Sequence, residues 1–260
     1  MSSSVRLADI ESQIDIYDFS NKVELKEILI KSRPDIVIHA ACCYGRAGES
    51  YLEIFDANVR FGVNLLSAII ELNMLDVAFF NIGTSLNSGV SAYALSKNQF
   101  SDWGKYIAAE SAGLLKFVNI KLEHVYGPFD GVNKFTSYVI NSCIENLPEL
   151  PLTLGEQRRD FIYIDDLVMA FDVLILNLPE LDSCESIAIG SGEAPQLKEF
   201  VLIVHSAIGS KTCLNFGAVP YRGTEEMYSC ADISRLKSLG WLPQISMADG
   251  IKAILRKQYS

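Results

Sequence analysis

The sequence predicts an α/β protein with a parallel sheet and a smaller C-terminal lobe. Short apolar runs alternate with longer segments of helical periodicity along most of the chain, as in βα units whose strands are buried on both faces. After Gly127 the pattern changes, because proline and glycine interrupt shorter elements as far as Gly155. With 260 residues, of which 49% are hydrophobic, the chain can form a large core.

The elements of the first half follow in order. A short strand is predicted at 13–18, and 23–34 predicts a helix that Pro34 stops. Buried strands are predicted for the runs DIVIHA (35–40), VAFFNIG (77–83) and KFVNIKL (116–122). Between these runs, 51–73 and 93–113 carry apolar residues at helical spacing and predict two long helices. Further helices are predicted at about 164–177, 195–208, 232–239 and 247–257.

Charge and cysteine usage exclude several functions. The formal net charge is -10 and no run of basic residues occurs, which argues against nucleic-acid or membrane binding but leaves room for a basic pocket that takes a small anion. The six cysteines show no metal-ligand spacing, so the sequence predicts free thiols in a reducing cytoplasm and no metal site. No stretch is long and apolar enough for a membrane span.

The motif YALSK (93–97) carries the first candidate catalytic residues. Tyr93 and Lys97 are four residues apart and therefore share one face of the predicted helix. An ammonium near a phenol stabilises the phenolate and lowers the phenol pKa, which suits proton exchange with a carbonyl or alcohol oxygen. The same pair also arises by chance on amphipathic helices, so the residues around it decide whether a catalytic role is favoured.

Two residues with hydroxyl side chains favour a catalytic role for this pair. Thr84 and Ser85 directly follow the predicted strand 77–83 and should lie at the carboxyl edge of the sheet, where open α/β sheets bind ligands. A hydroxyl there can hold a reacting carbonyl while Tyr93 protonates it, although either residue could instead cap a helix or turn. A catalytic role is favoured for at least one of the two residues, and Thr84 is preferred slightly over Ser85.

The remaining motifs match a known family in order. They are IHAA (38–41), NVRFGVNLL (58–66), GTS followed by YALSK, KLEHVYGP (121–128), RRDFIYIDDL (158–167), IGSGE (189–193) and ADISRLKSLGWLP (231–243). With these motifs the chain resembles the extended short-chain dehydrogenases/reductases that act on nucleotide sugars. Within the family, ACCYGR, GTSL, KLEHVYGPFDG, KFTS and MYSCADI are most similar to reductases of CDP-linked 4-keto-3,6-dideoxyhexoses, enzymes of O-antigen and polysaccharide sugar biosynthesis.

The resemblance implies roles for single residues. Tyr93 would be the general acid, Lys97 would hold the nicotinamide ribose and tune the tyrosine, and Thr84 or Ser85 would bind the sugar carbonyl. The implied contacts to the cofactor, NADP or NAD, come from Asp15, Ile16, Ala40, Ala41, Lys97 and His124. The implied contacts to a nucleotide-diphosphate sugar come from Arg46, His124, Arg159 and Arg222. The resemblance also implies a homodimer formed by the helices 51–73 and 93–113.

Plain structural roles remain possible for several of these residues. Asp15 could be a solvated strand end, Arg159 could form a structural ion pair with Asp160, and Arg46 could be a turn residue. Asn58 is predicted to serve packing and backbone hydrogen bonds, and His39 to be a core residue on an apolar strand.

One part of the family pattern is missing. No GxxGxxG or GxGxxG motif occurs, and the 12 residues before 13–18 cannot supply a strand, a glycine turn and a helix. The expected fold is therefore a Rossmann-type sheet lacking its first βα unit. In this interpretation 1–127 and 160–190 form the partial NAD(P)-binding domain, and 128–159 and 191–260 form the nucleotide-sugar lobe. A truncated chain, an inactive remnant and a partner that supplies the segment all stay open.

Three functions are compatible with these residues. The first is NAD(P)H-dependent reduction of the 4-keto group of a nucleotide-activated deoxysugar, and the second is 4-epimerisation of a nucleotide sugar. The third is nucleotide-sugar binding without catalysis. Dehydration is disfavoured, because Thr84 is followed by Ser85-Leu86-Asn87 where the dehydratases of this family generally carry an acidic pair.

Overall fold

The computed structural model describes residues 7, 10–17 and 22–259. Its centre is a sheet in the order β1-β2-β3-β8, and each neighbouring pair of strands is parallel. The strands are β1 (Ile36–His39), β2 (Val77–Ile82), β3 (Leu115–Leu122) and β8 (Cys184–Ile189). The predicted fold class is confirmed, and so are the three strands predicted in the first half.

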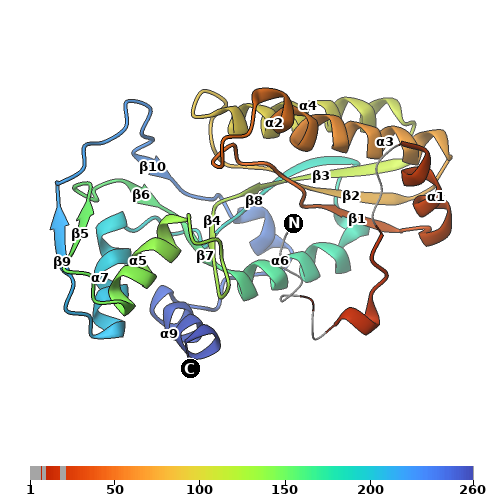
Figure 1. Ribbon diagram of the computed structural model, residues 1–260. Coiled ribbons are helices and arrows are strands. Elements are labelled where there is room, and N and C mark those ends of the chain that lie inside the picture. Colours follow the sequence, from red (N-terminus) through yellow and green to blue (C-terminus); the bar gives the residue numbers. More distant parts are fainter. Residues whose placement is uncertain (1–6, 8–9, 18–21, 260) are drawn as a thin grey trace.

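Helices cover both faces of this sheet (Figure 1). One face packs against α1 (Lys22–Ser32), α3 (Phe61–Glu71) and α4 (Ala92–Glu110), with α2 (Tyr51–Phe55) beside them. The other face packs against α6 (Ile164–Leu176) and α8 (Ser234–Ser238). Side chains alternate along each strand, so Phe79 points toward α3 and α4 while Phe80 points toward α6. This two-sided burial explains why the strands are continuous apolar runs in the sequence.

Two glycines allow the helices to approach closely. A Cβ atom at Gly104 of α4 would overlap the ring of Phe117 on β3, and one at Gly62 of α3 would overlap the ring of Phe100 on α4. Glycine therefore sets how closely α4 packs on the sheet, and with it the position of Tyr93 and Lys97 on the same helix.

The predicted helix 51–73 is helical from Tyr51 to Glu71 but irregular, and residues 72 and 73 form a turn. α2 and α3 are joined by a π-helical turn, Asp56–Arg60, which the sequence did not predict. A π-turn inserts an extra residue into the helix, and such turns are frequent at functional sites. Here the turn buries Asn58 completely, facing the sheet edge.

A second group of elements forms the C-terminal lobe, to the left of the sheet in Figure 1. Its helices are α5 (Phe135–Ile144), α7 (Leu197–Ile208) and α9 (Met247–Gln258). Its parallel strand pairs are β4 (His124–Tyr126) with β7 (Phe161–Tyr163), β5 (Glu149–Leu152) with β9 (Cys213–Phe216), and β6 (Arg158–Arg159) with β10 (Tyr228–Ser229). An aromatic core fills it, with Phe161 stacked on Phe200 at 4.7 Å between centroids. Since β3 runs almost directly into β4, the carboxyl edge of the sheet faces this lobe.

The strand predicted at 13–18 is wrong for the described residues. Glu11–Gln13 form a 3-10 helix, and 14–17 have no regular structure, while Asp18 lies outside the described residues. Ile16 is 64% exposed. A strand needs a hydrogen-bonded neighbour, and this segment has none among the described residues.

Candidate active site

Thr84, Tyr93 and Lys97 meet at the carboxyl edge of the sheet. Thr84 lies two residues beyond β2 and is only 8% exposed, and its Oγ1 accepts a hydrogen bond from Leu86 N at 3.2 Å. The Ser91 side chain caps α4 by accepting from Ala94 N at 3.1 Å, which places Tyr93 in the first helical turn. One turn later Lys97 faces the same side.

The Tyr93 phenol is held in its protonated form. Burial raises its pKa to about 12, and the thiol of Cys42 acts in the same direction, while the Thr84 hydroxyl and the charge of Arg46 oppose the rise. The expected lowering of this pKa is therefore wrong in this structure, because burial outweighs the favourable contacts. At neutral pH the group is a proton donor rather than a phenolate.

The amine of Lys97 is buried and lacks a hydrogen-bond acceptor among the described residues. It is 1% exposed, and its Nζ has no hydrogen-bond partner among the described residues. Burial lowers its pKa to about 8, so the ammonium form still dominates at neutral pH. An unpartnered buried cation is costly, so the geometry favours a ligand whose oxygen atoms reach Nζ.

Asn58 anchors the loop that follows β1. Its Oδ1 accepts from Cys43 N at 2.6 Å, and its Nδ2 donates to Cys43 O at 2.9 Å and to Ser96 Oγ at 2.9 Å. The predicted role of Asn58 in backbone hydrogen bonding is confirmed. Since Ser96 precedes Lys97, this one amide ties the β1 loop to the helix that carries the candidate catalytic pair.

Arg159 lies on β6 of the lobe and is 7% exposed. Its NH2 forms an ion pair with Glu225 Oε1 at 2.9 Å and donates to Glu226 O, so its charge partner is Glu225 rather than the suggested Asp160. Arg222 is exposed on the same turn, where its carbonyl accepts from Glu225 N at 3.0 Å. The two predicted diphosphate arginines therefore belong to one structural unit.

A hydrogen bond joins this unit of the lobe to the loop that carries Thr84. Asn87 Nδ2 donates to Glu226 Oε1 at 2.9 Å. No sequence pattern indicates a site role for Glu225, Glu226 or Asn87, because they are distant from one another along the chain and belong to no motif.

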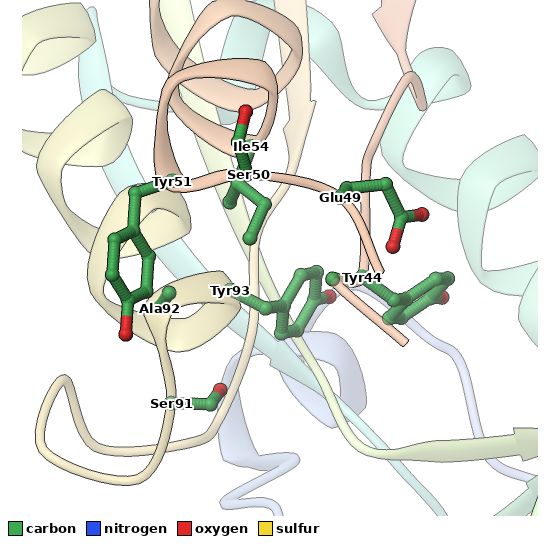
Figure 2. A pocket seen from close by; sticks show the side chains of 9 residues that line it. Tyr44, Glu49, Ser50, Tyr51, Ile54, Ser91, Ala92 and Tyr93 are labelled. Carbon is green, nitrogen blue, oxygen red and sulfur yellow. The ribbon is translucent and has the colours of Figure 1, made fainter. Parts of the chain in front are cut away.

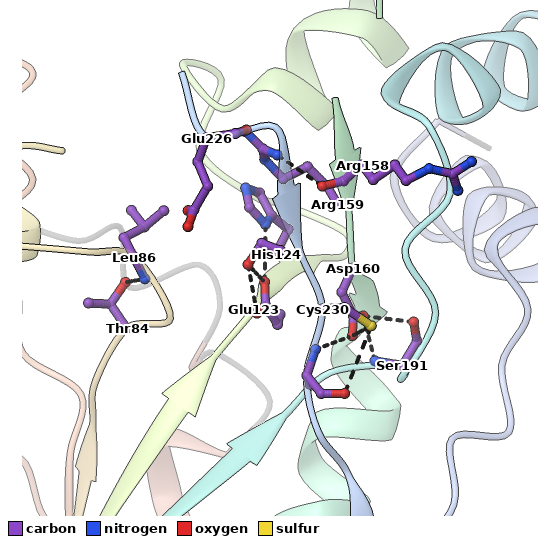
Figure 3. A network of polar contacts seen from close by, with 12 residues as sticks. Thr84, Leu86, Glu123, His124, Arg158, Arg159, Asp160, Ser191, Glu226 and Cys230 are labelled. Carbon is purple, nitrogen blue, oxygen red and sulfur yellow. Dashed lines mark hydrogen bonds and ion pairs between the residues drawn. The ribbon is translucent and has the colours of Figure 1, made fainter. Parts of the chain in front are cut away.

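His124 lies between these two groups (Figure 3). Its ring packs against Phe161 at 5.8 Å between centroids, and its Nδ1 is 3.7 Å from Glu123 Oε2. Glu123 is buried and accepts from Ser229 Oγ at 2.9 Å on both oxygens. His124 thus lies at the junction of sheet and lobe beside a buried carboxylate that the sequence did not single out, and its Nδ1 has no hydrogen-bond partner among the described residues.

The other predicted site residues are exposed, apart from Ser85, which is half-buried. Ala40 and Ala41 follow the end of β1 at the same sheet edge, and Arg46 lies further along that loop. Ser85 directly follows Thr84, and its N donates to Leu122 O at 3.3 Å. Asp15 and Ile16 are also exposed, and Asp15 Oδ2 accepts from the Tyr17 hydroxyl at 3.3 Å. The structure brings together the groups beyond β1, β2 and β3, and the roles of all these residues stay predictions.

Comparison with known families decides the class of protein. Residues 2–190 match the model of the NAD dependent epimerase/dehydratase family. The chain belongs to this family. It is therefore an NAD(P)-dependent oxidoreductase of the extended short-chain dehydrogenase/reductase type, and its cofactor is NAD or NADP.

Curated and solved members of the family resemble the chain over most of its length. It is 34% identical to CDP-abequose synthase of Salmonella typhimurium over 239 residues, which is 90% of this chain and 79% of that protein. It is 32% identical to CDP-abequose synthase of Salmonella muenchen, covering 84% and 75% of the two chains. The crystal structure of UDP-glucose 4-epimerase of Thermotoga maritima superposes with a TM-score of 0.83 at 19% identity, covering 98% of this chain and 88% of that one.

The residues near the carboxyl edge of the sheet are compatible with the family's cofactor, NAD or NADP, and the clearest sign is the buried amine of Lys97. The buried Nζ of Lys97 has no acceptor among the described residues and lies near the carboxyl edge of the sheet, where open α/β sheets bind ligands, so it can donate hydrogen bonds to hydroxyl groups of a bound cofactor. Ala40 and Ala41 expose backbone at the neighbouring strand end. Among the described residues there is no cluster suited to a metal ion, and no helix long and apolar enough to cross a membrane.

Proposed function

We propose that the chain reduces the 4-keto group of a nucleotide-activated deoxysugar, a CDP-4-keto-3,6-dideoxyhexose, with NAD(P)H. The observation that carries the proposal is a buried Tyr93 phenol beside the Thr84 hydroxyl, with the unpartnered amine of Lys97 one helical turn later. The named function of the relative at 34% identity supports the CDP-linked substrate.

Each side chain has one task in the proposed reaction. The bound cofactor supplies the hydride that reaches the carbonyl carbon. Thr84 donates a hydrogen bond to the carbonyl oxygen, and Tyr93 gives that oxygen its proton. The raised pKa of Tyr93 keeps the phenol in the donor form required for reduction. Lys97 binds the nicotinamide ribose, which the buried, partnerless Nζ can do without losing another contact.

We assign the substrate diphosphate to the part of the lobe formed by β6 and the turn that carries Arg222. Arg159 is buried there and Arg222 lies on the neighbouring turn, and a guanidinium suits phosphate because it offers parallel N–H donors. His124 lies between this part of the lobe and Thr84, where it would contact the sugar or the cofactor (Figure 3).

Binding and turnover test the assignment together. Calorimetry with NADPH and with CDP should show saturable binding of both, and a CDP-4-keto-3,6-dideoxyhexose should cause stoichiometric loss of NADPH absorbance. A 4-epimerase would interconvert epimers with no net loss of NADPH. Binding of CDP without NADPH would contradict reduction and favour a nucleotide-sugar binder.

We also propose that the chain forms a homodimer through α2 and α4. Both helices carry large exposed apolar side chains, which are Tyr51, Leu52, Leu95, Trp103 and Tyr106. Leu95, Trp103 and Tyr106 lie within about 80° of one another around α4, because eleven residues make about 3.1 turns and eight residues about 2.2 turns. Sedimentation should give twice the chain mass of 28.8 kDa, and Trp103→Glu should shift the equilibrium to monomer. If the wild-type protein were a monomer at micromolar concentration, the proposed dimer interface of α2 and α4 would be wrong.

A further inference from the structure

The loop after β1 carries an aromatic contact to the catalytic tyrosine that the proposed reaction does not use. The Tyr44 ring stacks on the Tyr93 ring, with centroids 4.8 Å apart and planes 29° from parallel. Figure 2 shows the two rings side by side at the edge of a cavity. Offset stacks of this kind contribute about 1 kcal/mol beyond the burial of their surface.

A cation completes the row. The guanidinium carbon of Arg46 lies 5.3 Å from the centroid of the Tyr44 ring. Its positive charge also reaches Tyr93, where it lowers the phenol pKa against the larger effect of burial. Arg46, Tyr44 and Tyr93 therefore form a continuous cation–aromatic–aromatic series.

The loop holds this geometry without burying it. Asn58 fixes both backbone polar groups of Cys43, the residue before Tyr44. Gly45 has φ +67°, and a Cβ there would lie 2.6 Å from Ile54, so the turn after Tyr44 requires glycine. Tyr44 itself is 42% exposed and lines a cavity of about 440 Å³ together with Tyr93. Packing of the core does not explain an aromatic ring placed this way.

We propose that Tyr44 and Arg46 are positioning residues for Tyr93. The Tyr44 ring holds the phenol against Thr84, and Arg46 stabilises the negative charge that forms on the phenol oxygen after proton transfer. This assigns Arg46 to the tyrosine rather than to the sugar. The part that concerns proton transfer rests on the proposed reduction, whereas the stack and its electrostatics do not.

The charged and titratable groups around this row come from several elements. Cys42 lies on the same loop and raises the pKa of both tyrosines, whose burial acts in the same direction. Asp130, on the loop after β4, further raises the pKa of Tyr44. Lys97 of α4 faces Cys42 and His39. Of these groups, Arg46 is the one whose positive charge lowers the pKa of Tyr93.

A titration without substrate tests the electrostatic part. In protein labelled with ¹³C at the tyrosine Cζ, the Tyr93 resonance is identified by its loss in Tyr93→Phe. Its shift is followed from pH 9 to the highest pH at which circular dichroism still shows the folded protein, and the midpoint, expected near pH 12 in the wild type, is obtained by fitting the onset of the titration. Arg46→Met should raise the titration midpoint by roughly half a pH unit, because a nearby cation favours the phenolate. Arg46→Lys should stay near the wild type. The control is Arg60→Met, which removes an exposed arginine paired with Asp56 at 2.9 Å and should change nothing.

Tyr44 variants test the stack. Tyr44→Ala should shift the Tyr93 resonance at neutral pH through loss of the ring current, and Tyr44→Phe should preserve it. In turnover, Tyr44→Ala should lower kcat about tenfold or more with little change in KM, and Tyr44→Phe should restore it.

The outcomes separate this inference from the proposed function. An unchanged Tyr93 resonance and midpoint in Tyr44→Ala and Arg46→Met would overturn the positioning role. A raised KM with an unchanged midpoint in Arg46→Met would do the same, because it would return Arg46 to the substrate. A wild type that reduces no nucleotide sugar would refute the proposed function, while the titration would still decide the inference.

Discussion

Tyr93→Phe should lower turnover by a factor of about 10² to 10⁴ and leave the affinity for CDP nearly unchanged. The substitution removes only the phenol oxygen, which is the proposed proton donor beside Thr84. General acid catalysis contributes about 10² to 10⁴ in rate, and no other hydroxyl of the α4 first turn replaces it in this arrangement. In the proposed arrangement CDP binds to the lobe, where Arg159 and Arg222 lie, so loss of the phenol oxygen removes no nucleotide contact.

Steady-state kinetics with NADPH, together with CDP calorimetry, measures both parts of this result. The matched control is Tyr106→Phe, because Tyr106 lies on the same helix but is 62% exposed. This variant should keep wild-type turnover. Undiminished turnover in Tyr93→Phe would remove the tyrosine from the mechanism, and lost CDP binding would show that the phenol holds substrate.

The parts of the site that lie on regular elements could be predicted from the sequence. A four-residue spacing on a helix placed Tyr93 and Lys97 on one face, and the position of Thr84 after an apolar run placed it at the sheet edge. Both inferences use local periodicity, which survives folding. The direction of the Tyr93 pKa shift could not be obtained this way, because burial depends on the loops that cover the ring.

Contacts between distant segments were out of reach. Arg159 pairs with Glu225, 66 residues further along the chain, and no local pattern encodes that partner. The π-turn that aims Asn58 at the β1 loop has nearly the same apolar spacing as an α-helix, so periodicity predicts only a helix there. The short strands of the lobe were missed for a similar reason, since their pairing partners lie 37 to 70 residues away.

Asp160 makes several such long-range contacts with one buried carboxylate. It is fully buried, and its carboxylate accepts from Ser191 N at 2.6 Å, Ser191 Oγ at 2.7 Å, Gly192 N at 2.9 Å and Ala231 N at 3.1 Å (Figure 3). It thereby joins the β6–β7 junction to the loop after β8 and to the segment after β10. The GSG stretch at 190–192, too weak a pattern to indicate phosphate binding, thus binds a carboxylate of its own chain.

Asp160→Ala should lower the free energy of unfolding by about 3 to 5 kcal/mol, because three backbone N–H groups lose their acceptor in a buried place. For a chain of this size that corresponds to a fall in Tm of roughly 10 °C. Circular dichroism during thermal and urea unfolding measures the change. Asp165→Ala is the control, since Asp165 is exposed and its carboxylate lies 3.6 Å from Lys257 Nζ, a pair worth under about 1 kcal/mol. Equal stability of the two variants would show that the donors find other acceptors and that Asp160 does not hold the junction.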